Sequence, residues 1–373
     1  MLSFFAPRAV RHGRLVHKHA RKFLSYKSDV MSAADREDFE HDLASLGAAI
    51  HAHDGKQIEA MSESLDRKVI TRFPPPADAA WRENCEVFLV AIIIALAVRT
   101  YFLQPFTIPT GSMQPTLNGI IGHPTKEPPP NVFARIANFA IFGRTYVNVV
   151  SEVDDNIVDL VEAKRFLFFT YTEIQCANRS YMVHASRSTL ASNLLGAPRA
   201  YRAGEVIVRG YINTGDHVFV DKITYNFRAP YRGEVFVFST SKIRTRENQM
   251  TPDAPSQYYI KRLGGLPGDE LRIDPPNLYA NGQLATEPGF ARVIASSDGY
   301  RGYSNGPEGG RHFDYLGEPD QPFRVPAHSY FALGDNSYHS SDSRDWGIVP
   351  EQNLMGRGVF VYWPFAPHWG LIR

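Results

Sequence analysis

The stretch that decides the fold is Pro105-Phe106-Thr107-Ile108-Pro109-Thr110-Gly111-Ser112-Met113-Gln114-Pro115-Thr116-Leu117, which follows the only long apolar run of the chain. Three prolines restrict the backbone and remove hydrogen-bond donors, so the stretch is neither a helix interior nor a central strand. It predicts a rigid turn that presents one small polar residue, Ser112. An ordinary turn and a catalytic serine explain the Gly-Ser pair equally well so far, since turns favour glycine, proline and serine for local reasons.

The apolar run before this stretch is long enough to cross a membrane. It covers residues 86–103, and a bilayer span requires about 17–20 residues. Arg99 can extend to the interface at one end, where the aromatic rings of Tyr101 and Phe102 are also favoured. A buried core helix is the alternative, but the run lacks a polar face. We therefore expect a transmembrane helix over residues 83–104.

The distribution of basic residues predicts the orientation of this helix. Lysines and arginines are frequent on its N-terminal side, whereas none lies between Arg99 and Lys126. Short segments rich in these residues stay in the cytoplasm. Residues 1–82 are therefore expected in the cytoplasm and the large C-terminal part outside, with Ser112 close to the outer face of the membrane.

The segment before the membrane helix has two parts. Residues 1–30 are basic, and charge follows their short apolar start instead of preceding it, so they predict a basic arm and not a cleaved leader. Residues 32–70 carry apolar residues at helical spacing on both sides of Asp54-Gly55, which predicts a helical hairpin. The hairpin is a spacer or an oligomerisation module, and the pattern favours the spacer.

The chain beyond the serine turn is mainly β in pattern. From Gly215 onward, short runs rich in aromatic and β-branched residues alternate with Gly-Asp turns, which is typical of an all-β barrel or sandwich. The fold class is therefore mainly β, preceded by one membrane helix and a helical segment. The expected domains are 105–121 with 215–365 as the main β domain, 122–214 as an insertion without an assigned role, 274–325 as an inserted β subdomain, and 366–373 as a C-terminal tail.

Composition argues against several classes of function. The formal net charge is +1, which provides no global field for nucleic acid, and no nucleic-acid partner is expected. Cys85 and Cys176 lie far apart and match neither a CxxC nor a zinc spacing. We therefore expect no metal, no cofactor and no disulfide.

Four blocks, in order after the apolar run, resemble bacterial signal peptidase I, a membrane-bound Ser-Lys endopeptidase. The resemblance covers about residues 83–121 and 215–365, roughly half of the chain. The blocks are Pro-Thr-Gly-Ser-Met-Gln-Pro-Thr-Leu at 109–117, Gly-Asp-His-Val-Phe-Val-Asp-Lys at 215–222, Tyr-Ile-Lys-Arg-Leu-Gly-Gly-Leu-Pro-Gly-Asp at 259–269, and Gly-Asp-Asn followed by Ser-Ser-Asp-Ser-Arg-Asp-Trp-Gly at 334–347.

The resemblance implies that Ser112 is the nucleophile and Lys261 its general base. A serine hydroxyl needs an adjacent base, and a lysine is such a base only where burial lowers its pKa. Lys261 lies in an alternating segment whose same-face neighbours are Tyr259 and Leu263, with Arg262 on the opposite face. Most lysines are solvated, so the assignment depends on the place of Lys261 in its block.

The resemblance also assigns groups around the nucleophile. Thr110 would join the backbone N–H of Ser112 in an oxyanion hole, and an ordinary turn cap is the alternative. Met113 and Ile108 would shape the substrate pocket. For Met113, packing beneath the site is equally favoured.

Three further residues would support the base. Ser340 would hydrogen-bond Lys261 and orient it, and Asp342 with Arg344 would form an ion pair that stabilises the site. The best-known members have Gly-Asp-Asn-Arg-Asp-Asn-Ser where this chain has Gly-Asp-Asn-Ser-Tyr-His-Ser at residues 334–340. The charged pair is replaced by Ser337-Tyr338, which leaves the structure of this loop open.

His339 lies next to this block and suggests a Ser-His-Asp triad as another possibility. No motif around the other histidines supports a triad. We therefore interpret His339 as a loop residue.

The resemblance implies a serine protease that removes signal peptides from secreted preproteins, cutting after small residues through an acyl-enzyme. Its partners would be preproteins and the lipid bilayer of the inner membrane, with the site on the periplasmic side and an undetermined oligomeric state. A catalytically silent membrane-anchored scaffold is the alternative, favoured if Ser112 or Lys261 were missing. A Ser-Lys autoprotease with a DNA-binding domain predicts a basic helix-turn-helix and no membrane helix, which is the opposite of this pattern.

Overall fold

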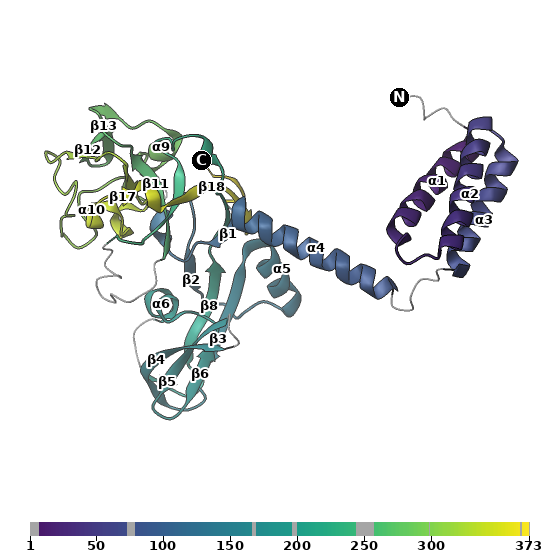
Figure 1. Ribbon diagram of the computed structural model, residues 1–373. Helices are drawn as coiled ribbons and strands as arrows, with labels where there is room; N and C mark the ends of the chain where they lie inside the picture. Colours follow the sequence, from purple (N-terminus) through teal and green to yellow (C-terminus); the bar gives the residue numbers. More distant parts are fainter. Residues whose placement is uncertain are drawn as a thin grey trace. The chain divides into compact units, whose positions relative to one another are not determined.

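The computed structural model divides the chain into two compact units, Met1–Ile93 and Ile94–Arg373. The boundary falls within helix α4 (Ala79–Tyr101), which is drawn in Figure 1. The structure describes residues 7–72, 79–165, 169–195, 200–243, 257–297, 299–365 and 368–372.

Three helices pack together in the first unit. They are α1 (Arg8–Lys27), α2 (Ala33–Ala52) and α3 (Gly55–Arg72). Helices α2 and α3 coincide with the hairpin expected over residues 32–70. The fully or nearly fully buried side chains of this bundle are Val10, Val16, Ala20, Phe39, Leu43, Leu46, Ala49, Ile50, Ile58 and Leu65.

The basic segment at the start of the chain differs from the expected arm, because residues 8–27 form helix α1 of the bundle. Val10, Gly13, Val16 and Ala20 are buried and recur every three or four residues, which makes a narrow stripe on one face. Gly13 permits a close helix–helix contact, since a Cβ there would lie 2.4 Å from Cγ2 of Ile58. Basic residues are more numerous in α1 than the four residues of this stripe, so the helical pattern was not recognised from the sequence.

Helix α4 is the one helix within the described ranges that is long and apolar enough to cross a membrane. Its candidate span, Trp81–Tyr101, has 21 residues, and its side chains are not buried in the structure. The expected span over residues 83–104 extends past the end of the helix, because strand β1 begins at Leu103.

The second unit is built on an eight-stranded antiparallel sheet of order β1-β9-β18-β10-β11-β16-β17, with β19 paired to β18. Strand β1 pairs with β9, so the segments 105–121 and 215–365 share one sheet. The strands are β1 (Leu103–Thr107), β9 (His217–Asp221), β10 (Val235–Ser239), β11 (Tyr258–Gly265), β16 (Ser329–Leu333), β17 (Val349–Pro350), β18 (Leu354–Trp363) and β19 (Gly370–Leu371).

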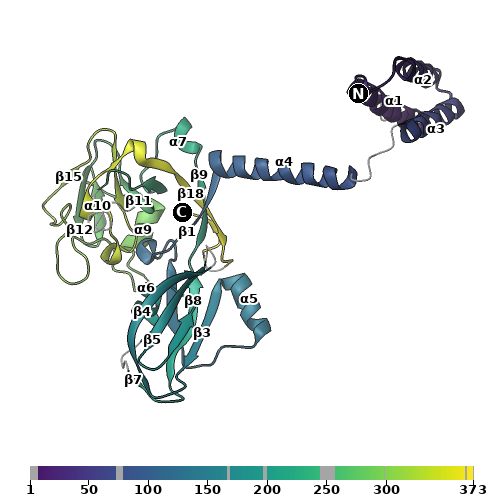
Figure 2. The same cartoon turned by 60° about the horizontal axis from the view of Figure 1, so that its bottom comes forward.

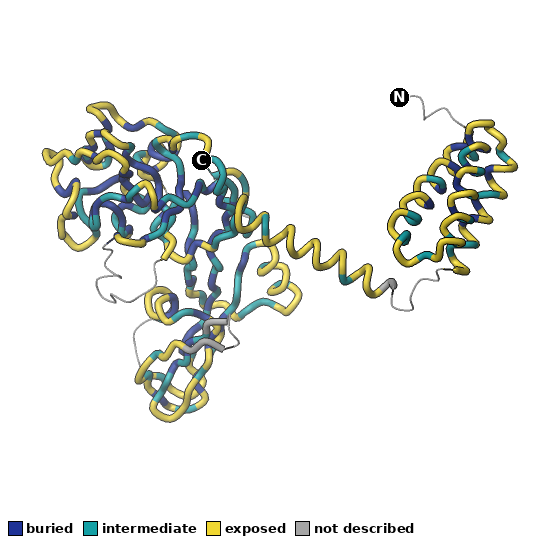
Figure 3. The backbone as a smooth tube through the Cα atoms, in the orientation of Figure 1, coloured by how far each residue is buried: buried dark blue, intermediate teal, exposed yellow. Residues whose placement is uncertain are grey.

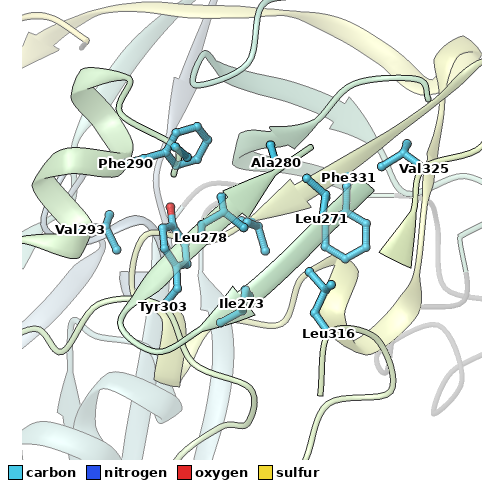
Figure 4. Packing of buried hydrophobic residues seen from close by; sticks show 12 residues of the cluster. Leu271, Ile273, Leu278, Ala280, Phe290, Val293, Tyr303, Leu316, Val325 and Phe331 are labelled. Carbon is cyan, nitrogen blue, oxygen red and sulfur yellow. The ribbon is translucent and has the colours of Figure 1, made fainter. Parts of the chain in front are cut away.

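A smaller sheet of order β14-β13-β12-β15 lies at residues 270–324, where an inserted subdomain was expected. With α9 and strand β16 of the main sheet it encloses a hydrophobic core, in which Leu271, Leu278 and Phe290 are fully buried (Figure 4). Its elements are β12 (Glu270–Asp274), β13 (Asn277–Ala280), β14 (Gln283–Leu284), α9 (Pro288–Ile294) and β15 (Phe323–Arg324).

The insertion at 122–214 is also a β structure with its own core, and Figures 1 and 2 both show it beside the main sheet. It contains two sheets, β2-β8-β3 and β6-β5-β4-β7. Its elements are β2 (Ile120–Pro124), α5 (Val132–Phe142), β3 (Arg144–Val150), β4 (Asp155–Arg165), β5 (Phe169–Cys176), β6 (Ser180–Val183), α6 (Arg187–Thr189), the π-helical turn η2 (Leu190–Leu194), β7 (Ala200–Tyr201) and β8 (Val206–Thr214).

The C-terminal segment is part of the fold where it is described. Strand β19 pairs with β18 within what was expected as a tail. Nδ1 of His368 lies 2.8 Å from a carboxylate oxygen of the buried Asp216. Short elements complete the unit, namely α7 (Thr224–Phe227), α10 (Ser343–Trp346) and the 3-10 turns η1 (Gly111–Met113), η3 (Ser337–His339) and η4 (Glu351–Asn353).

Candidate active site

The side chains of Ser112 and Lys261 meet between the turn η1 and strand β11. Nζ of Lys261 lies 2.6 Å from Oγ of Ser112, a hydrogen bond between residues 149 positions apart. Turn η1 follows β1 after three residues, and β11 lies between β10 and β16. The fold therefore brings together the two residues that were expected as nucleophile and base.

Lys261 is almost completely enclosed. Its side chain is 4% exposed, and it lies opposite Phe236 of β10 in the sheet register. Its amine lies 5.9 Å from the centre of the Tyr259 ring, which is on the same face of β11 as expected. Ser112 is half-buried, so its hydroxyl is the part of the pair that a substrate can reach.

The carbonyl groups of the serine turn are held by the loop after β16. The backbone N–H of Asn336 donates to the carbonyl of Ser112, and its side-chain amide donates to the carbonyl of Gly111, both at 3.1 Å. The loop comes close to the serine turn at Gly334, where a side chain would not fit. A Cβ there would lie 2.7 Å from the carbonyl oxygen of Ser112 and 2.0 Å from Oγ of Ser340. These contacts explain why glycine and asparagine occur in this loop.

Thr110 lies immediately before the turn and is exposed. Its hydroxyl lies 3.3 Å from Oγ of Ser112. The amide of Ser112 lies in the first turn of η1, where backbone N–H groups lack a partner within the helix. The two donors expected for an oxyanion hole thus lie within three residues of each other, one on the N-cap of η1 and one on the nucleophile itself.

Ser340 differs from the expectation. It is buried, but its hydroxyl has no hydrogen-bond partner in the described parts of the chain, so the predicted bond to Lys261 is not formed in this structure. The side chain of Ser340 lies against Gly334, where a Cβ would come within 2.0 Å of its Oγ. A buried hydroxyl without a partner carries a desolvation penalty.

Asp342 and Arg344 form the expected ion pair, with Nη2 and Oδ2 2.7 Å apart and neither side chain exposed. Asp342 also accepts a hydrogen bond from the backbone of Gly334. Burial by itself would raise the pKa of Asp342, but the charge and hydrogen bonds of Arg344, with a smaller effect of Lys261, hold this pKa below its usual range. The pair therefore fixes the loop that contacts the serine turn.

Neighbouring arginines contact Ser337 and Tyr338, the two residues that stand in place of the usual charged pair. The guanidinium of Arg344 donates to the hydroxyl and to the carbonyl of the buried Ser337. The guanidinium of Arg301 lies 4.0 Å from the centre of the Tyr338 ring. The side chain of His339 is exposed, and its Nε2 lies 3.2 Å from Glu308, which fits a loop residue.

A second buried ion pair was missed by sequence reasoning. Arg262 and Asp335 are both inaccessible to solvent, with Nη2 and Oδ2 2.6 Å apart, and Thr116 donates to the same carboxylate. Arg262 is on the face of β11 opposite to Lys261, as expected, but α9 covers that face. A Cβ at Gly289 of α9 would lie 1.9 Å from Nη1 of Arg262. The only sequence signal was the presence of both charges inside the blocks at 259–269 and 334–347.

Ile108 and Met113 lie in the hydrophobic core instead of at a surface. They are 2% and 0% exposed and pack with Leu117, Val218 and Val220. Met113 thus occupies the position beneath the site that was one of its two expected roles. No group of histidine, cysteine, aspartate and glutamate side chains in the described ranges is arranged to hold a metal ion.

Comparison with known proteins agrees with this arrangement. The family model of signal peptidase, peptidase S26, matches residues 81–121 and 208–363, which is more than half of the chain. The chain belongs to this signal peptidase family. The match includes α4, the serine turn and all strands of the main sheet up to β18, whereas α1–α3 and residues 122–207 lie outside it.

Several named signal peptidases are similar to the chain. Probable signal peptidase I-2 of Synechocystis sp. is 35% identical over 43% of this chain and 61% of its own length, and signal peptidase I of Leptolyngbya laminosa is 34% identical over 41% and 63%. The chain thus spans about three fifths of these curated relatives. A signal peptidase I structure from Enterococcus faecalis aligns with 35% of this chain and 97% of its own at 25% identity, with a TM-score of 0.25.

Proposed function

We propose that this protein is a membrane-anchored serine endopeptidase that removes signal peptides from secreted preproteins. The observation that carries the proposal is the 2.6 Å contact between Oγ of Ser112 and the enclosed amine of Lys261. Such a pair is chemically unusual, because most lysines are solvated and cannot accept a proton from serine. The proposal is further supported by membership in the signal peptidase family.

The geometry supports an acyl-transfer mechanism. Oγ of Ser112 attacks the carbonyl carbon of the scissile peptide bond, and Lys261 takes the hydroxyl proton as this bond forms. The hydroxyl of Thr110 and the N–H of Ser112 donate hydrogen bonds to the resulting oxyanion. Lys261 then passes the proton to the leaving amine, which completes the acyl-enzyme.

Hydrolysis of the acyl-enzyme reverses these roles. Lys261 removes a proton from a water molecule that attacks the ester carbonyl, and it returns this proton to Oγ of Ser112. Asn336 and Gly334 keep the serine turn against the loop that contains Asp342. In this proposal, these groups position the nucleophile and do not exchange protons.

The substrates proposed are preproteins that carry a signal peptide, in line with the relatives that are named signal peptidase I. Small residues before the cut are proposed because the motif resemblance implies them. We further propose that α4 spans the inner membrane with residues 1–82 in the cytoplasm. The absence of lysine and arginine between Arg99 and Lys126 supports this orientation. The serine turn would then lie close to the periplasmic face of the membrane, where a preprotein's cleavage site emerges.

Cleavage of a purified preprotein by the full-length protein in detergent tests the proposal. The variants are Ser112→Ala and Lys261→Met, which keeps an apolar chain of similar length in the buried site. Lys126→Ala serves as the control, because Lys126 is exposed and lies outside the site. We expect the wild type and the control to cut after the small residues, and both site variants to be folded and inactive.

Two results would contradict the proposal. Activity of Lys261→Met at the wild-type rate would require another base. Binding of the preprotein by wild type without cleavage would favour a catalytically silent scaffold.

A further inference from the structure

Helix α5 (Val132–Phe142) has its hydrophobic side chains on the outside. None of its residues is buried, and the exposed fractions of Phe133, Ile136 and Phe139 are 85%, 62% and 50%. Figure 3 shows the helix coloured mostly as exposed. A surface helix of a water-soluble domain carries its apolar residues toward the core instead.

The side of α5 that faces the protein carries only one large apolar residue, Phe142, beside the small Ala134 and the polar Asn138. Asn138 donates a hydrogen bond from its side-chain amide to the hydroxyl of Tyr146 on β3, and it is half-buried together with Ala134 and Phe142. These three residues are spaced four apart and form the inner stripe of the helix. Most of the apolar side chains of α5 therefore lie on its outer face, as expected for a helix whose outer face contacts an apolar medium.

The position of α5 is fixed by the main sheet. The indole N–H of Trp363, at the end of β18, donates to the carbonyl of Ala140 at 2.8 Å, and the amide of Phe365 donates to the carbonyl of Ile141. The exposed side chains of Phe365 and Trp369 extend the apolar surface, with ring centres 6.5 Å apart. Aromatic side chains of this kind are enriched where proteins meet the bilayer interface.

Strand pairing connects this surface to the candidate membrane helix. Strand β18 pairs with β9, and β9 pairs with β1, which begins two residues after α4 ends. The end of α4 is also hydrogen-bonded to the sheet, because the amine of Lys222 donates to the carbonyl of Thr100. Helix α5 is therefore attached to the sheet whose first strand follows the proposed membrane span. This attachment places α5 close enough to the bilayer to contact lipid.

Length and charge agree with a helix that lies in the interface. Eleven residues make a helix about 16 Å long, which is too short to cross a bilayer and suits an interfacial segment. Residues 128–151 contain no acidic residue, and the exposed Arg135 on α5 can contact anionic headgroups.

We propose that α5, together with Phe365 and Trp369, inserts its outer face into the lipid headgroup and acyl boundary. This surface lies in a segment outside the family match, and it would hold the serine turn at a set distance from the bilayer. The inference rests on the proposed membrane span of α4 and not on peptide cleavage. The occupant is lipid, rather than a second copy of the chain.

Depth-dependent quenching in vesicles tests this inference. The full-length protein, with Cys85→Ser and Cys176→Ser, is given one cysteine at a time and labelled with an environment-sensitive fluorophore. The positions are Phe133→Cys on α5, Ile93→Cys in α4 and Gln283→Cys on the exposed strand β14. The vesicles contain phosphatidylcholine and phosphatidylglycerol, with nitroxide groups at a shallow or a deep acyl position.

We expect the label at position 133 to be blue-shifted and quenched most by shallow nitroxides. The label at position 93 is expected to be quenched most by deep nitroxides, and the label at 283 by neither. Adding Ile136→Ser with Phe139→Ser should at least halve the quenching at position 133. The matched change of two exposed valines on β4, Val158→Ser with Val161→Ser, should leave it unchanged.

Three outcomes would overturn the inference. Quenching at 133 no greater than at 283 places α5 in water. A blue shift without quenching by lipid, or a shift that disappears as protein is diluted in lipid, means that protein covers the helix. Absence of quenching at both 93 and 133 removes the membrane span as well, whereas loss of preprotein cleavage with quenching intact leaves the inference standing and contradicts only the proposed function.

Discussion

At the scale of a single residue, replacing Ser340 is expected to affect stability and catalysis differently. Its buried hydroxyl has no partner in the described structure, so replacing it with a methyl group removes an unsatisfied polar atom. We expect Ser340→Ala to leave the free energy of unfolding unchanged or to raise it by up to about 1 kcal/mol. If the hydroxyl turns to Lys261 when a substrate binds, the same variant lowers kcat, by about tenfold for each 1.4 kcal/mol of lost stabilisation.

Thermal unfolding and steady-state cleavage of a preprotein, measured on the same preparation, check this expectation. Ser340→Thr provides the comparison, because it keeps the hydroxyl while adding a methyl group beside Gly334. A loss of stability in Ser340→Ala of about 2 kcal/mol would show that the hydroxyl is hydrogen-bonded in the folded protein.

Single residues also show the limit of sequence reasoning. Ser112 and Lys261 could be predicted because their blocks resemble a family, and they meet at 2.6 Å. The alternation of β11 placed Arg262 on the other face, but it did not reveal that this face is covered and that the charge is paired with Asp335. Whether the far side of a strand is solvent or a second core depends on elements distant in the sequence.

At the scale of the element, two glycines in the helical bundle provide a matched test. A Cβ at Gly13 in α1 would lie 2.4 Å from Cγ2 of Ile58, whereas a Cβ at Gly47 in α2 would have its nearest neighbour at 3.6 Å. Alanine is favoured over glycine inside a helix by about 1 kcal/mol. We expect Gly47→Ala to stabilise the bundle by about that amount, and Gly13→Ala to destabilise it by about 1–3 kcal/mol through overpacking.

Hydrogen exchange of the amides of α1, α2 and α3 in the full-length protein measures both effects. Protection should rise in Gly47→Ala and fall in Gly13→Ala. An equal gain in both variants would mean that α1 does not pack against α3 through Gly13.

Two elements differ from what their sequences indicated, for related reasons. Helix α1 is a bundle helix although basic residues dominate its sequence, because a narrow buried stripe is sufficient when two other helices share the core. Helix α5 lies in the insertion that had no assigned role, and most of its apolar residues face outward. Pattern predicts that a helix forms, and the surroundings decide which face is buried.

For the whole molecule, the buried carboxylates predict acid lability. Burial opposes ionisation of Asp342, Glu234 and Asp269, but paired arginines and hydrogen bonds outweigh it and lower the pKa of each of the three. The folded state therefore binds fewer protons than the unfolded state near their ordinary pKa values of 3.8 and 4.5. Their contribution to stability is complete above those values and is lost as the pH falls through the lower folded values.

Denaturant unfolding of the full-length protein between about pH 7 and pH 3 checks this expectation. This range includes the pH at which carboxylates change their charge. The midpoint should be nearly constant in the upper part of the range and should fall steeply below about pH 4. Asp269→Asn should have a shallower acid slope than wild type, since it removes one of the linked groups. A midpoint that rises toward low pH would contradict the assignment.

The sequence by itself determined the mainly β class, the apolar helix and the residues of the serine and lysine blocks. These properties are local, since they depend on periodicity, run length and short motifs. Only the tertiary structure decided that two buried ion pairs flank the site, that Ser340 lacks its expected bond, and that residues 122–214 form two sheets with a core of their own. Each of these depends on contacts between residues far apart in the chain, and such contacts are fixed by packing and by the satisfaction of buried charges.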